Sequence, residues 1–405
     1  MKHKACIAAR SIRRHKGGHM KQLTIVLDGI ADRPQQKLEG KSPMEAAKTP
    51  GLDALCAAGK AGTVRTIPQG LEIGSAVANL SLLGYDPAGT YKGRAVIEAA
   101  GAGLAVKQGA LYVRCNFVTL EGQSFEQSVM QSYSAHDIET PKARPLTQRL
   151  NEEVFGGAAQ LIHTDTFRNI LVVDGAAREA EQLLFTPAHE MIGNKLAEHL
   201  HGCAAMQPYF DMLRKAYDVL SKDNETKANG IWFWGASYAP HFGPPPPGRR
   251  VILAETTLMR GIAALLHTDC VSTAEDAGFE QYLKDKTADA IHALEEYDYA
   301  YIHIQKLDDL SHELMPKEKA HAIEMIDSFF IQPFFAQIRM PYSAMIVSDH
   351  YTFSDSGGHG AEPAPFLLLG HGADGNAGRF TEPCCRETGF DLTAPQLVAI
   401  QRGEG

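Results

Sequence analysis

Short apolar runs recur along the chain and are separated by stretches with helical character. The clearest runs are residues 23–27, 251–254, 299–304, 344–348 and 364–369. Strands that are covered on both faces of a parallel sheet read as continuous apolar runs, without the alternation of a half-exposed strand. The pattern therefore predicts an α/β fold with a doubly wound sheet, in which each run is one buried strand.

Helix signals fill the segments between the first runs. Pro43 stands at a first helical position, and a second helix starts near Pro50 and stops at Gly59. A third helical stretch follows Ser75 and ends at Gly84. A serine after a glycine is a frequent N-cap, so Ser75 is either an ordinary helix cap or, given suitable partners, a nucleophile.

The pattern changes after residue 106. Strand-like runs at residues 112–122, 160–163 and 170–174 precede a helical stretch at 209–220. Residues 243–248 place four prolines between two glycines, which predicts a stiff linker that cannot join a sheet. We therefore expect a metal-binding main domain made of residues 20–106 and 249–405, and a smaller inserted α+β domain made of residues 107–248 that binds substrate.

The composition is that of a globular protein, and it argues against some classes of binding partner. Of its 405 residues, 44% are hydrophobic and 21% are charged, and the length makes two domains the default. A net charge of -9 with scattered basic residues argues against a nucleic-acid partner. No segment approaches the length of a membrane span, so no membrane partner is expected. The negative net charge still allows small phosphorylated substrates, because metal ions and a few arginines can make the electrostatic potential inside one cleft positive.

Cysteine usage and the first residues bear on the compartment. The seven cysteines are an odd number without a CxxC motif, which favours a reducing cytoplasm over a disulfide framework or a zinc ribbon. Residues 1–19 are basic, and their apolar run at 5–9 is too short for a secretory signal. We expect residues 1–19 to form a disordered extension, with Met20 as an alternative start of translation.

Carboxylates and histidines follow the predicted strands in separate clusters. If the runs are parallel neighbours, these side chains meet at one edge of the sheet. The groups are Asp28 after the first run, Asp308 and His312 four residues apart, the adjacent pair Asp349 and His350, and His359 in a glycine-rich loop. Carboxylate and imidazole ligands without thiolate suit manganese, zinc or a related divalent ion.

Ser75 completes the chemistry that these ligands suggest. Together with the acidic and histidine clusters it offers enough ligands for two metal ions. A two-metal site activates an oxygen nucleophile and clamps both oxygens of an in-line phosphoryl displacement. The residues alone predict a metal-dependent phosphoryl or sulfuryl transferase or hydrolase, in which Ser75 accepts the group and passes it on.

At this level of detail the chain resembles a known family. The motifs in order are Asp28-Gly29, residues 49–53, Gly74-Ser75, residues 80–87, residues 91–94, Asp308 with His312, Asp349-His350, and His359 with residues 363–365. They are similar to those of cofactor-independent (2,3-bisphosphoglycerate-independent) phosphoglycerate mutases of the archaeal type, within the alkaline phosphatase superfamily. The resemblance covers residues 22 to 400 approximately and implies an alkaline-phosphatase-like fold.

The resemblance also implies a reaction and a division of the ligands. One metal would be held by Asp28, Ser75, Asp349 and His350, and the other by Asp308, His312 and His359. Mn²⁺ is the expected ion, with Zn²⁺ or Mg²⁺ as alternatives. The implied activity is the interconversion of 3-phosphoglycerate and 2-phosphoglycerate through a phosphoserine at Ser75.

Substrate contacts are implied for further basic residues. Arg94, Arg114, His136 and Arg168 are the candidates for binding the substrate carboxylate and phosphate. His136 and Lys306 are the candidates for proton transfer. The oligomeric state is left open by the sequence.

Several segments depart from the family pattern, among them residues 132–138 in place of an arginine-rich segment, and they keep other functions open. Ala76 follows the serine where the family commonly has aspartate, and residues 305–307 before Asp308 are atypical. The run at residues 230–235 is similar to a bacterial subgroup proposed to act as homoserine kinases. The alternatives are therefore a homoserine-kinase-like phosphotransferase on the same scaffold, or a degenerate, non-catalytic homologue.

Overall fold

The computed structural model describes residues 20–157, 159–223, 225–370 and 375–404. The extension predicted at residues 1–19 lies outside them. The chain forms two compact units: one contains the segments up to Tyr91 and from Phe242 onward, and the other runs from Lys92 to His241. The second unit thus begins before the predicted residue 107, because helix α6 (Arg94–Gly101) packs on strands of that unit.

The first unit is built on an eight-stranded sheet with the order β15-β2-β14-β11-β1-β10-β8-β9. β14 runs antiparallel to β11 and β2, whereas the other pairs in this sheet are parallel. The strands are β1 (Lys21–Leu27), β2 (Lys60–Arg65), β8 (Arg250–Leu253), β9 (Asp269–Val271), β10 (Tyr299–Ile304), β11 (Tyr342–Val347), β14 (Ala364–Leu369) and β15 (Asp391–Thr393). Each of the five predicted runs is one of these strands, and the predicted α/β fold class is confirmed.

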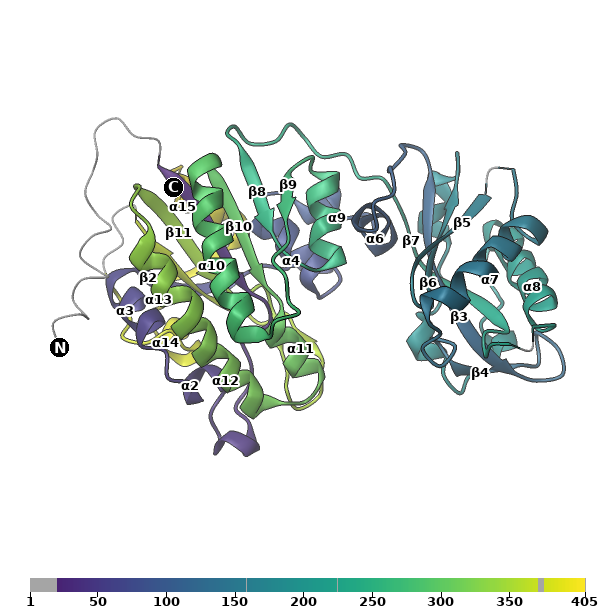
Figure 1. The fold of residues 1–405 in the computed structure, drawn as a ribbon, viewed down its shortest axis with the longest axis horizontal. Helices are drawn as coiled ribbons and strands as arrows, with labels where there is room; N and C mark the ends of the chain where they lie inside the picture. Colours follow the sequence, from purple (N-terminus) through teal and green to yellow (C-terminus); the bar gives the residue numbers. More distant parts are fainter. Residues whose placement is uncertain (1–19, 158, 224, 371–374, 405) are drawn as a thin grey trace. The chain divides into compact units, whose positions relative to one another are not determined.

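Helices cover both faces of this sheet. One face carries α3 (Pro50–Ala58), α10 (Phe279–Glu296), α12 (Pro316–Ile326) and α13 (Gln332–Gln337), and the other carries α4 (Ser75–Leu82), α9 (Thr257–Leu265) and α15 (Ala394–Arg402). In Figure 1, α10, α12 and α13 lie in front of the sheet. Strand alternation separates the faces: Ile25 and Ile302 enter the core with α10 and α12, whereas Tyr301 reaches Asn79 of α4. The sheet is therefore doubly wound.

Shorter elements connect these layers. They are η1 (Gln36–Leu38), α2 (Pro43–Ala46), α5 (Pro87–Thr90), α11 (Lys306–His312), the π-helical turn η6 (Asp327–Ile331), α14 (Glu382–Glu387), and the small pair β12 (Tyr351–Thr352) and β13 (His359–Gly360). The predicted helix starts at Pro43 and Pro50 are confirmed, and Ser42 and Glu45 form a capping box at the first of them. These local signals hold in the structure because caps are satisfied within one turn.

The second unit is an antiparallel sheet with helices packed on it. β3 (Leu111–Glu121) pairs with β4 (Val129–Ser132), β6 (Arg168–Val173) and β7 (Gly230–Tyr238), and β5 (Ala159–Asp165) pairs with β6. The longer helices are α7 (Thr140–Glu153) and α8 (Gln207–Leu220), and η2 (Ala177–Gln182), η3 (Ala188–Met191), η4 (Leu196–Glu198) and η5 (Ala204–Met206) are short 3₁₀ turns. A separate apolar core built around Phe117, Phe210 and Trp232 holds this unit together.

No helix in the described part of the chain has both the length and the apolar character needed to cross a membrane.

Candidate metal centre

The predicted ligands meet at one edge of the main sheet because of strand direction. β1, β10 and β11 are parallel neighbours, so their carboxyl ends share an edge. Asp28 follows β1, Asp308 lies shortly after β10, and Asp349 follows β11. β14 runs the other way, so the segment that precedes it, including His359, also returns to this edge. Segments far apart in the sequence thus converge on one site.

One group of ligands is formed by Asp308, His312 and His359. The Nε2 atoms of His312 and His359 lie 3.2 and 3.3 Å from the two carboxylate oxygens of Asp308 and 3.1 Å from each other. Burial opposes ionisation of Asp308, but hydrogen bonds with both histidines outweigh it and hold the pKa of this carboxyl well below its usual range. Three donor atoms that face one point are the geometry of a divalent cation site.

Neighbouring groups orient the two imidazoles. His312 Nδ1 lies 2.7 Å from the Gly357 carbonyl oxygen, so it donates its proton there and leaves Nε2 free as a ligand. His350 Nδ1 lies 3.1 Å from Thr352 Oγ1, and the Thr352 hydroxyl donates to Asp308 at 2.8 Å. His350 must therefore donate from Nδ1, which leaves its Nε2 as an acceptor or ligand.

A second group surrounds Asp28. Asp28 and Asp349 are fully buried, and the two oxygens of Asp28 have no hydrogen-bond partner among the described residues. His350 Nε2 lies 3.7 Å from Asp28 Oδ1 and 3.4 Å from Asp349 Oδ2. Burial, followed by the charges of Asp349 and Asp308, raises the pKa of Asp28 well above its ordinary value. A divalent cation would offset both causes, because it supplies positive charge and ligand contacts to the unsatisfied oxygens.

His303 belongs to this second group and was missed from the sequence. It lies on β10 opposite Val26, with its side chain on the α4 face, and its Nε2 is 3.2 Å from Asp28 Oδ2. Neither ring nitrogen has a hydrogen bond in the described structure, and burial lowers the pKa of His303 to about 4. The imidazole is therefore neutral, the form that ligates metals. The available signal was a polar residue inside an otherwise apolar strand.

The two groups adjoin each other, and the division of ligands that the resemblance implied stays a prediction. Asp308 also forms a set with Asp28 and His350, with all three donor atoms within 4.8 Å of one another. Asp28, His303 and Asp349 form a further set of this kind. Asp28 and Asp308 each belong to two of these sets, so the donor atoms form one continuous cluster. Such a cluster is large enough for two nearby cations.

Ser75 lies next to these ligand clusters, in contact with His350. It is the first residue of α4, and the N-cap residue of this helix is Gly74. The Ser75 Oγ lies 3.0 Å from His350 Nε2. The structure thus departs from the interpretation of Ser75 as an ordinary helix cap. Its position at a helix N-terminus places backbone N–H groups near any anion that Oγ receives.

Asn79 fixes the position of Ser75 relative to the buried carboxylates. Its Nδ2 donates to the Ser75 carbonyl at 2.8 Å and to Asp349 Oδ2 at 3.1 Å. The Tyr301 hydroxyl donates to Asn79 Oδ1 at 2.5 Å. One buried amide therefore ties α4, β10 and the loop after β11 together.

Gly29 allows the close approach of two loops at the centre. Its φ is +61°, and a Cβ there would overlap Thr352 Oγ1, the hydroxyl that bridges His350 and Asp308. Its amide also donates to Asp349 Oδ1 at 3.1 Å. The Asp28-Gly29 motif therefore needs glycine for reasons of both conformation and space.

The chemistry of the donor set fits divalent cations. Three buried carboxylates lie close together and repel one another, and the two oxygens of Asp28 and both ring nitrogens of His303 have no hydrogen bond among the described residues. Asp28, Asp349, Asp308, His312 and His359 are the residues that would hold such ions, joined by His303, His350 and Ser75 Oγ. This set confirms a divalent-metal site in general and does not select one metal.

Comparisons with known proteins place this centre in a family. The family model described as 2,3-bisphosphoglycerate-independent phosphoglycerate mutase matches residues 56–224. The 2,3-bisphosphoglycerate-independent phosphoglycerate mutase of Methanosarcina barkeri is 32% identical over 368 residues, covering 86% of this chain and 90% of that protein. The chain belongs to the 2,3-bisphosphoglycerate-independent phosphoglycerate mutase family. An enzyme of the same name, numbered 2, from Methanothermobacter thermautotrophicus is 30% identical over 88% of this chain and 90% of its own length.

Solved structures agree with the fold of this mutase family. The PH0037 protein from Pyrococcus horikoshii superposes with a TM-score of 0.76 at 25% identity, covering 95% of this chain and 97% of that one. The cofactor-independent phosphoglycerate mutase from Thermoplasma acidophilum gives a TM-score of 0.63 at 20% identity, covering 95% of this chain and 100% of that one. The latter likeness concerns the fold alone.

Arg94 and Arg114 lie together in the second unit. Both guanidinium groups pair with Glu98, at 2.8 and 2.9 Å. Arg114 also stacks on the Trp234 ring at 3.5 Å, and the Trp234 indole donates to Asn116. Their substrate-binding role stays a prediction.

His136 and Arg168 occupy exposed loops or strand ends of the same unit. His136 has a left-handed backbone, φ 55°, and its amide donates to Ser132 Oγ at 2.9 Å. Arg168 lies over the Phe167 ring at 4.2 Å and donates to Thr166 at 3.1 Å. Neither contact tests the predicted substrate and proton-transfer roles.

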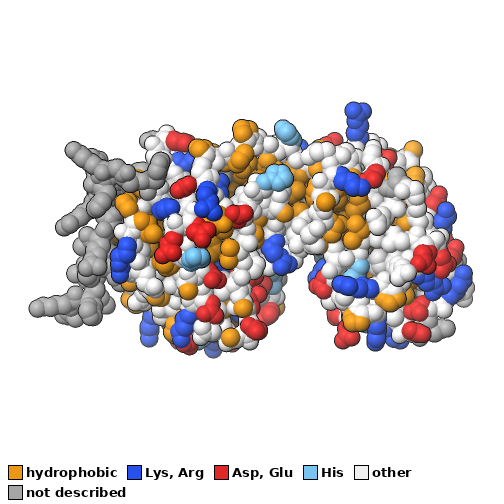
Figure 2. Space-filling model, turned by 45° about the horizontal axis from the view of Figure 1, so that its top comes forward, with side chains coloured by type: hydrophobic (Ala, Val, Ile, Leu, Met, Phe, Trp, Pro, Cys, Tyr) orange, Lys and Arg blue, Asp and Glu red, His pale blue; other side chains and the backbone are white. Residues whose placement is uncertain are grey.

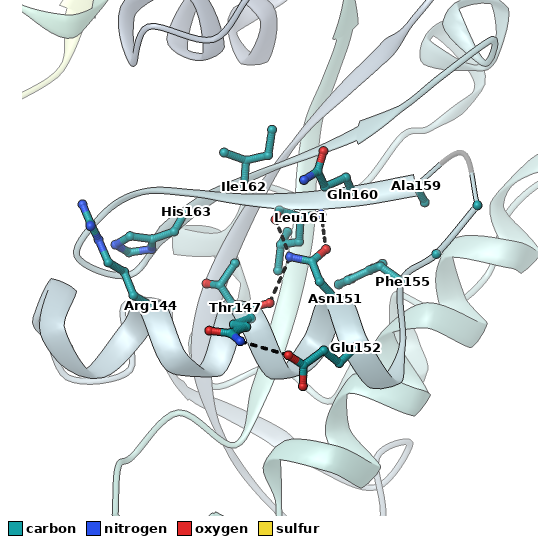
Figure 3. A pocket seen from close by; sticks show the side chains of 13 residues that line it. Arg144, Thr147, Asn151, Glu152, Phe155, Ala159, Gln160, Leu161, Ile162 and His163 are labelled. Atoms are coloured by element: carbon teal, nitrogen blue, oxygen red, sulfur yellow. Dashed lines mark hydrogen bonds between the residues drawn. The ribbon is translucent and has the colours of Figure 1, made fainter.

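Two of the hollows in the described structure lie away from the ligand clusters, on α7 and on α11. One of about 590 Å³ lies between α7 and β5 of the second unit, with Arg144, Asn151 and His163 on its wall, and contains no predicted site residue (Figure 3). The other, of about 420 Å³, is lined by Lys306. The side chain of Lys306 therefore faces a different surface from the ligands of its own helix.

Proposed function

We propose that the protein interconverts 3-phosphoglycerate and 2-phosphoglycerate through a phosphoserine at Ser75. The observation that carries this proposal is the contact of Ser75 Oγ with His350 Nε2, at 3.0 Å, beside the buried Asp28 and Asp349. A hydroxyl held at the N-terminus of a helix against a metal-ligand cluster is suited to accept a phosphoryl group. The activity named for the family relatives points the same way.

The chain's own groups explain how Ser75 is prepared. The Thr352 hydroxyl directs its proton to Asp308, so His350 keeps its proton on Nδ1 and presents the Nε2 lone pair to Ser75 Oγ. Asn79 holds the Ser75 backbone against Asp349. Two bound divalent ions would supply Lewis-acid stabilisation of the charge on the transferred group. We propose Mn²⁺ as the ion, since the donor set is oxygen and imidazole without thiolate.

The proposal assigns the substrate's remaining groups to the second unit. Arg94 and Arg114 would bind its carboxylate or phosphate, because a guanidinium recognises both in a bidentate way. His136 and Arg168 stay candidates for further contacts or proton transfer, whereas the side chain of Lys306 lies on the side of α11 opposite the metal ligands. We propose that neither nucleic acid nor a membrane is a partner. On the face in Figure 2, basic side chains are interspersed with acidic ones, which supports the absence of a nucleic-acid surface. The proposed compartment is the cytoplasm, which the cysteine pattern favours.

A homoserine-kinase-like transfer is the second candidate function. It rests on residues 230–235, which are similar to a bacterial subgroup proposed to act as homoserine kinases, and it is compatible with Ala76, which is 7% exposed and places an apolar group beside Ser75. The family pattern commonly has a carboxylate there, so the surroundings of the transferred group are changed in this chain.

The decisive experiment compares the two candidate substrates, and it compares a Ser75 variant with a control variant at Ser81. Purified protein with Mn²⁺ should convert 3-phosphoglycerate in an enolase-coupled assay, and Ser75→Ala should lower the rate by at least about 10³-fold while the fold is kept, because the covalent acceptor is lost. Ser81→Ala is the matched control: it makes the same change in α4, and the Ser81 hydroxyl is buried without a partner in the described structure.

Each outcome has a clear meaning. Turnover of homoserine with a nucleotide, and none with phosphoglycerate, would replace the mutase proposal by the kinase one. Full activity of the Ser75→Ala protein would exclude the phosphoserine route. Mass spectrometry of protein quenched during turnover should find a phosphate on Ser75.

A further inference from the structure

Helix α11 presents two different faces to its surroundings. Asp308 and His312 are four residues apart and form the face with the metal ligands. Lys306 and Leu310 are also four residues apart, but this pair is offset by two positions, which is about 200° around the helix axis. Lys306 and Leu310 therefore point away from the metal centre and toward α12, the neighbour of α11 (Figure 1).

The hollow on that side has an apolar floor. Leu310 from α11, Ala322 and Met325 from α12, and Phe279 from the start of α10 line a volume of about 420 Å³. Leu310 and Ala322 are buried, whereas Phe279 and Met325 are half-buried, so this floor is only partly covered by the protein. Its volume lies within the range of small-molecule pockets, about 300–1,000 Å³.

The rim of the hollow is mainly basic. Lys306, Lys317 and His321 stand around it with one carboxylate, Glu318. Across the described ranges, the ammonium groups of Lys306 and Lys317 form no ion pair and no hydrogen bond with the protein. The charge of Lys306 acts on Asp309 and Glu275 without a direct ion pair. Two ammonium groups without a hydrogen-bonded partner beside an apolar floor suit a ligand with an acidic group and an apolar body.

We propose that this hollow binds a small organic anion with an apolar body, of the aryl carboxylate or aryl phosphate class. The body would cover Leu310 and Ala322 and release water from them, and the acidic group would pair with Lys306 and Lys317. A neutral aryl ligand would form no ion pair with the ammonium groups. A small hydrophilic anion would leave the apolar floor exposed to water, so both kinds of ligand should bind more weakly. The site is separate from the metal centre, so it can be tested without turnover.

The test uses the full-length protein loaded with diamagnetic Mg²⁺, and ¹⁹F NMR. The probe is 4-(trifluoromethyl)benzoate, and its uncharged counterpart is 4-(trifluoromethyl)benzamide. We expect the benzoate to bind with a Kd of about 1 mM or less and the amide to bind at least about tenfold more weakly. The proposal would be overturned if the protein did not broaden the ¹⁹F signal of the benzoate at benzoate concentrations up to about 10 mM, or if both compounds bound equally well.

Variants place the probe in the hollow. Lys317→Met should weaken benzoate binding about three- to tenfold, and Ala322→Phe should abolish it by filling the floor. Lys284→Met is the control, because Lys284 is an exposed lysine of α10 that pairs with Glu280 outside the hollow. Lys317 is exposed, so its variant should fold even if Ala322→Phe does not. Benzoate binding that is the same in Lys317→Met as in Lys284→Met would place the probe elsewhere, for example at the metal centre, and would disprove the site.

Discussion

His303 shows how much a single buried residue adds to the centre. It is 1% exposed, has no hydrogen bond in the described structure, and faces the unsatisfied Asp28. A neutral imidazole without a partner costs free energy in a core, so its retention beside two buried carboxylates fits a group that ligates or positions a ligand.

Replacing His303 should therefore weaken metal binding. We expect His303→Gln to raise the Kd for Mn²⁺ about 10- to 100-fold, because it removes one donor from the set with Asp28 and Asp349. Isothermal titration calorimetry measures the effect. His292→Gln is the control, since His292 is an exposed histidine of the same unit. Unchanged Mn²⁺ affinity in a folded His303→Gln protein would refute the assignment.

At the scale of elements, a carboxylate from one helix organises the start of another. Asp327, in the π-helical turn between α12 and α13, accepts hydrogen bonds from the amides of Gly51 and Leu52 at 3.0 and 2.6 Å. These amides are among the unpaired donors at the N-terminus of α3, where a negative charge is favoured. A Cβ at position 51 would lie 2.5 Å from Gln332 Cγ and 2.8 Å from Asp327 Oδ1, so both side chains favour glycine there.

Truncating Asp327 should destabilise the main unit. We expect Asp327→Ala to lower the free energy of unfolding by about 2–4 kcal/mol, because two buried amides lose their acceptor. Asp327→Asn keeps one carbonyl acceptor and should cost less. Urea unfolding of the two variants measures both values. Equal stability of the alanine variant and the unmodified protein would show that water replaces the carboxylate.

At the scale of the whole molecule, a buried polar network joins distant segments of the main unit. Glu382 of α14 accepts hydrogen bonds from the Asp32 amide at 3.0 Å and the Ser42 hydroxyl at 2.7 Å. Asp32 in turn pairs with the fully buried Lys319 of α12 at 3.2 Å. Burial raises the pKa of Glu382 from 4.5 to about 7.

This pKa predicts a stability that falls with rising pH. The folded state holds the Glu382 proton more tightly than the unfolded state, so stability is full below the unfolded value of 4.5 and declines until the pH passes about 7. The loss from this group is on the order of 3 kcal/mol. Glu382→Gln should remove that slope, because an amide mimics the protonated carboxyl.

Urea unfolding with a chelator, at about pH 5 and pH 8, compares the two proteins without metal linkage. From about pH 5 to about pH 8, the free energy of unfolding of the unmodified protein should fall more than that of the Glu382→Gln protein. A constant difference would contradict the raised pKa.

The sequence by itself determined five strands of the first unit and the helix starts at Pro43 and Pro50, and the metal ligands that it proposed stay a prediction. Each strand appeared because a fully covered strand must be apolar at successive positions, and each helix start carried its own local signals. Asp28, Asp308, Asp349 and His359 could be placed at one edge because strand direction fixes where carboxyl ends meet. This pattern needs only local information and the topology of a parallel sheet.

The tertiary structure alone decided which side chains share space. His303 joined the centre because its strand is in register with β1, and Lys306 faced the hollow because the helix turns it away from Asp308. Gly51 is favoured because Asp327 and Gln332 approach from other helices. Such contacts depend on distances between segments remote in sequence, which no local pattern encodes. The contact of Ser75 Oγ with His350 Nε2 was decided in the same way, since only the fold brings these two residues together.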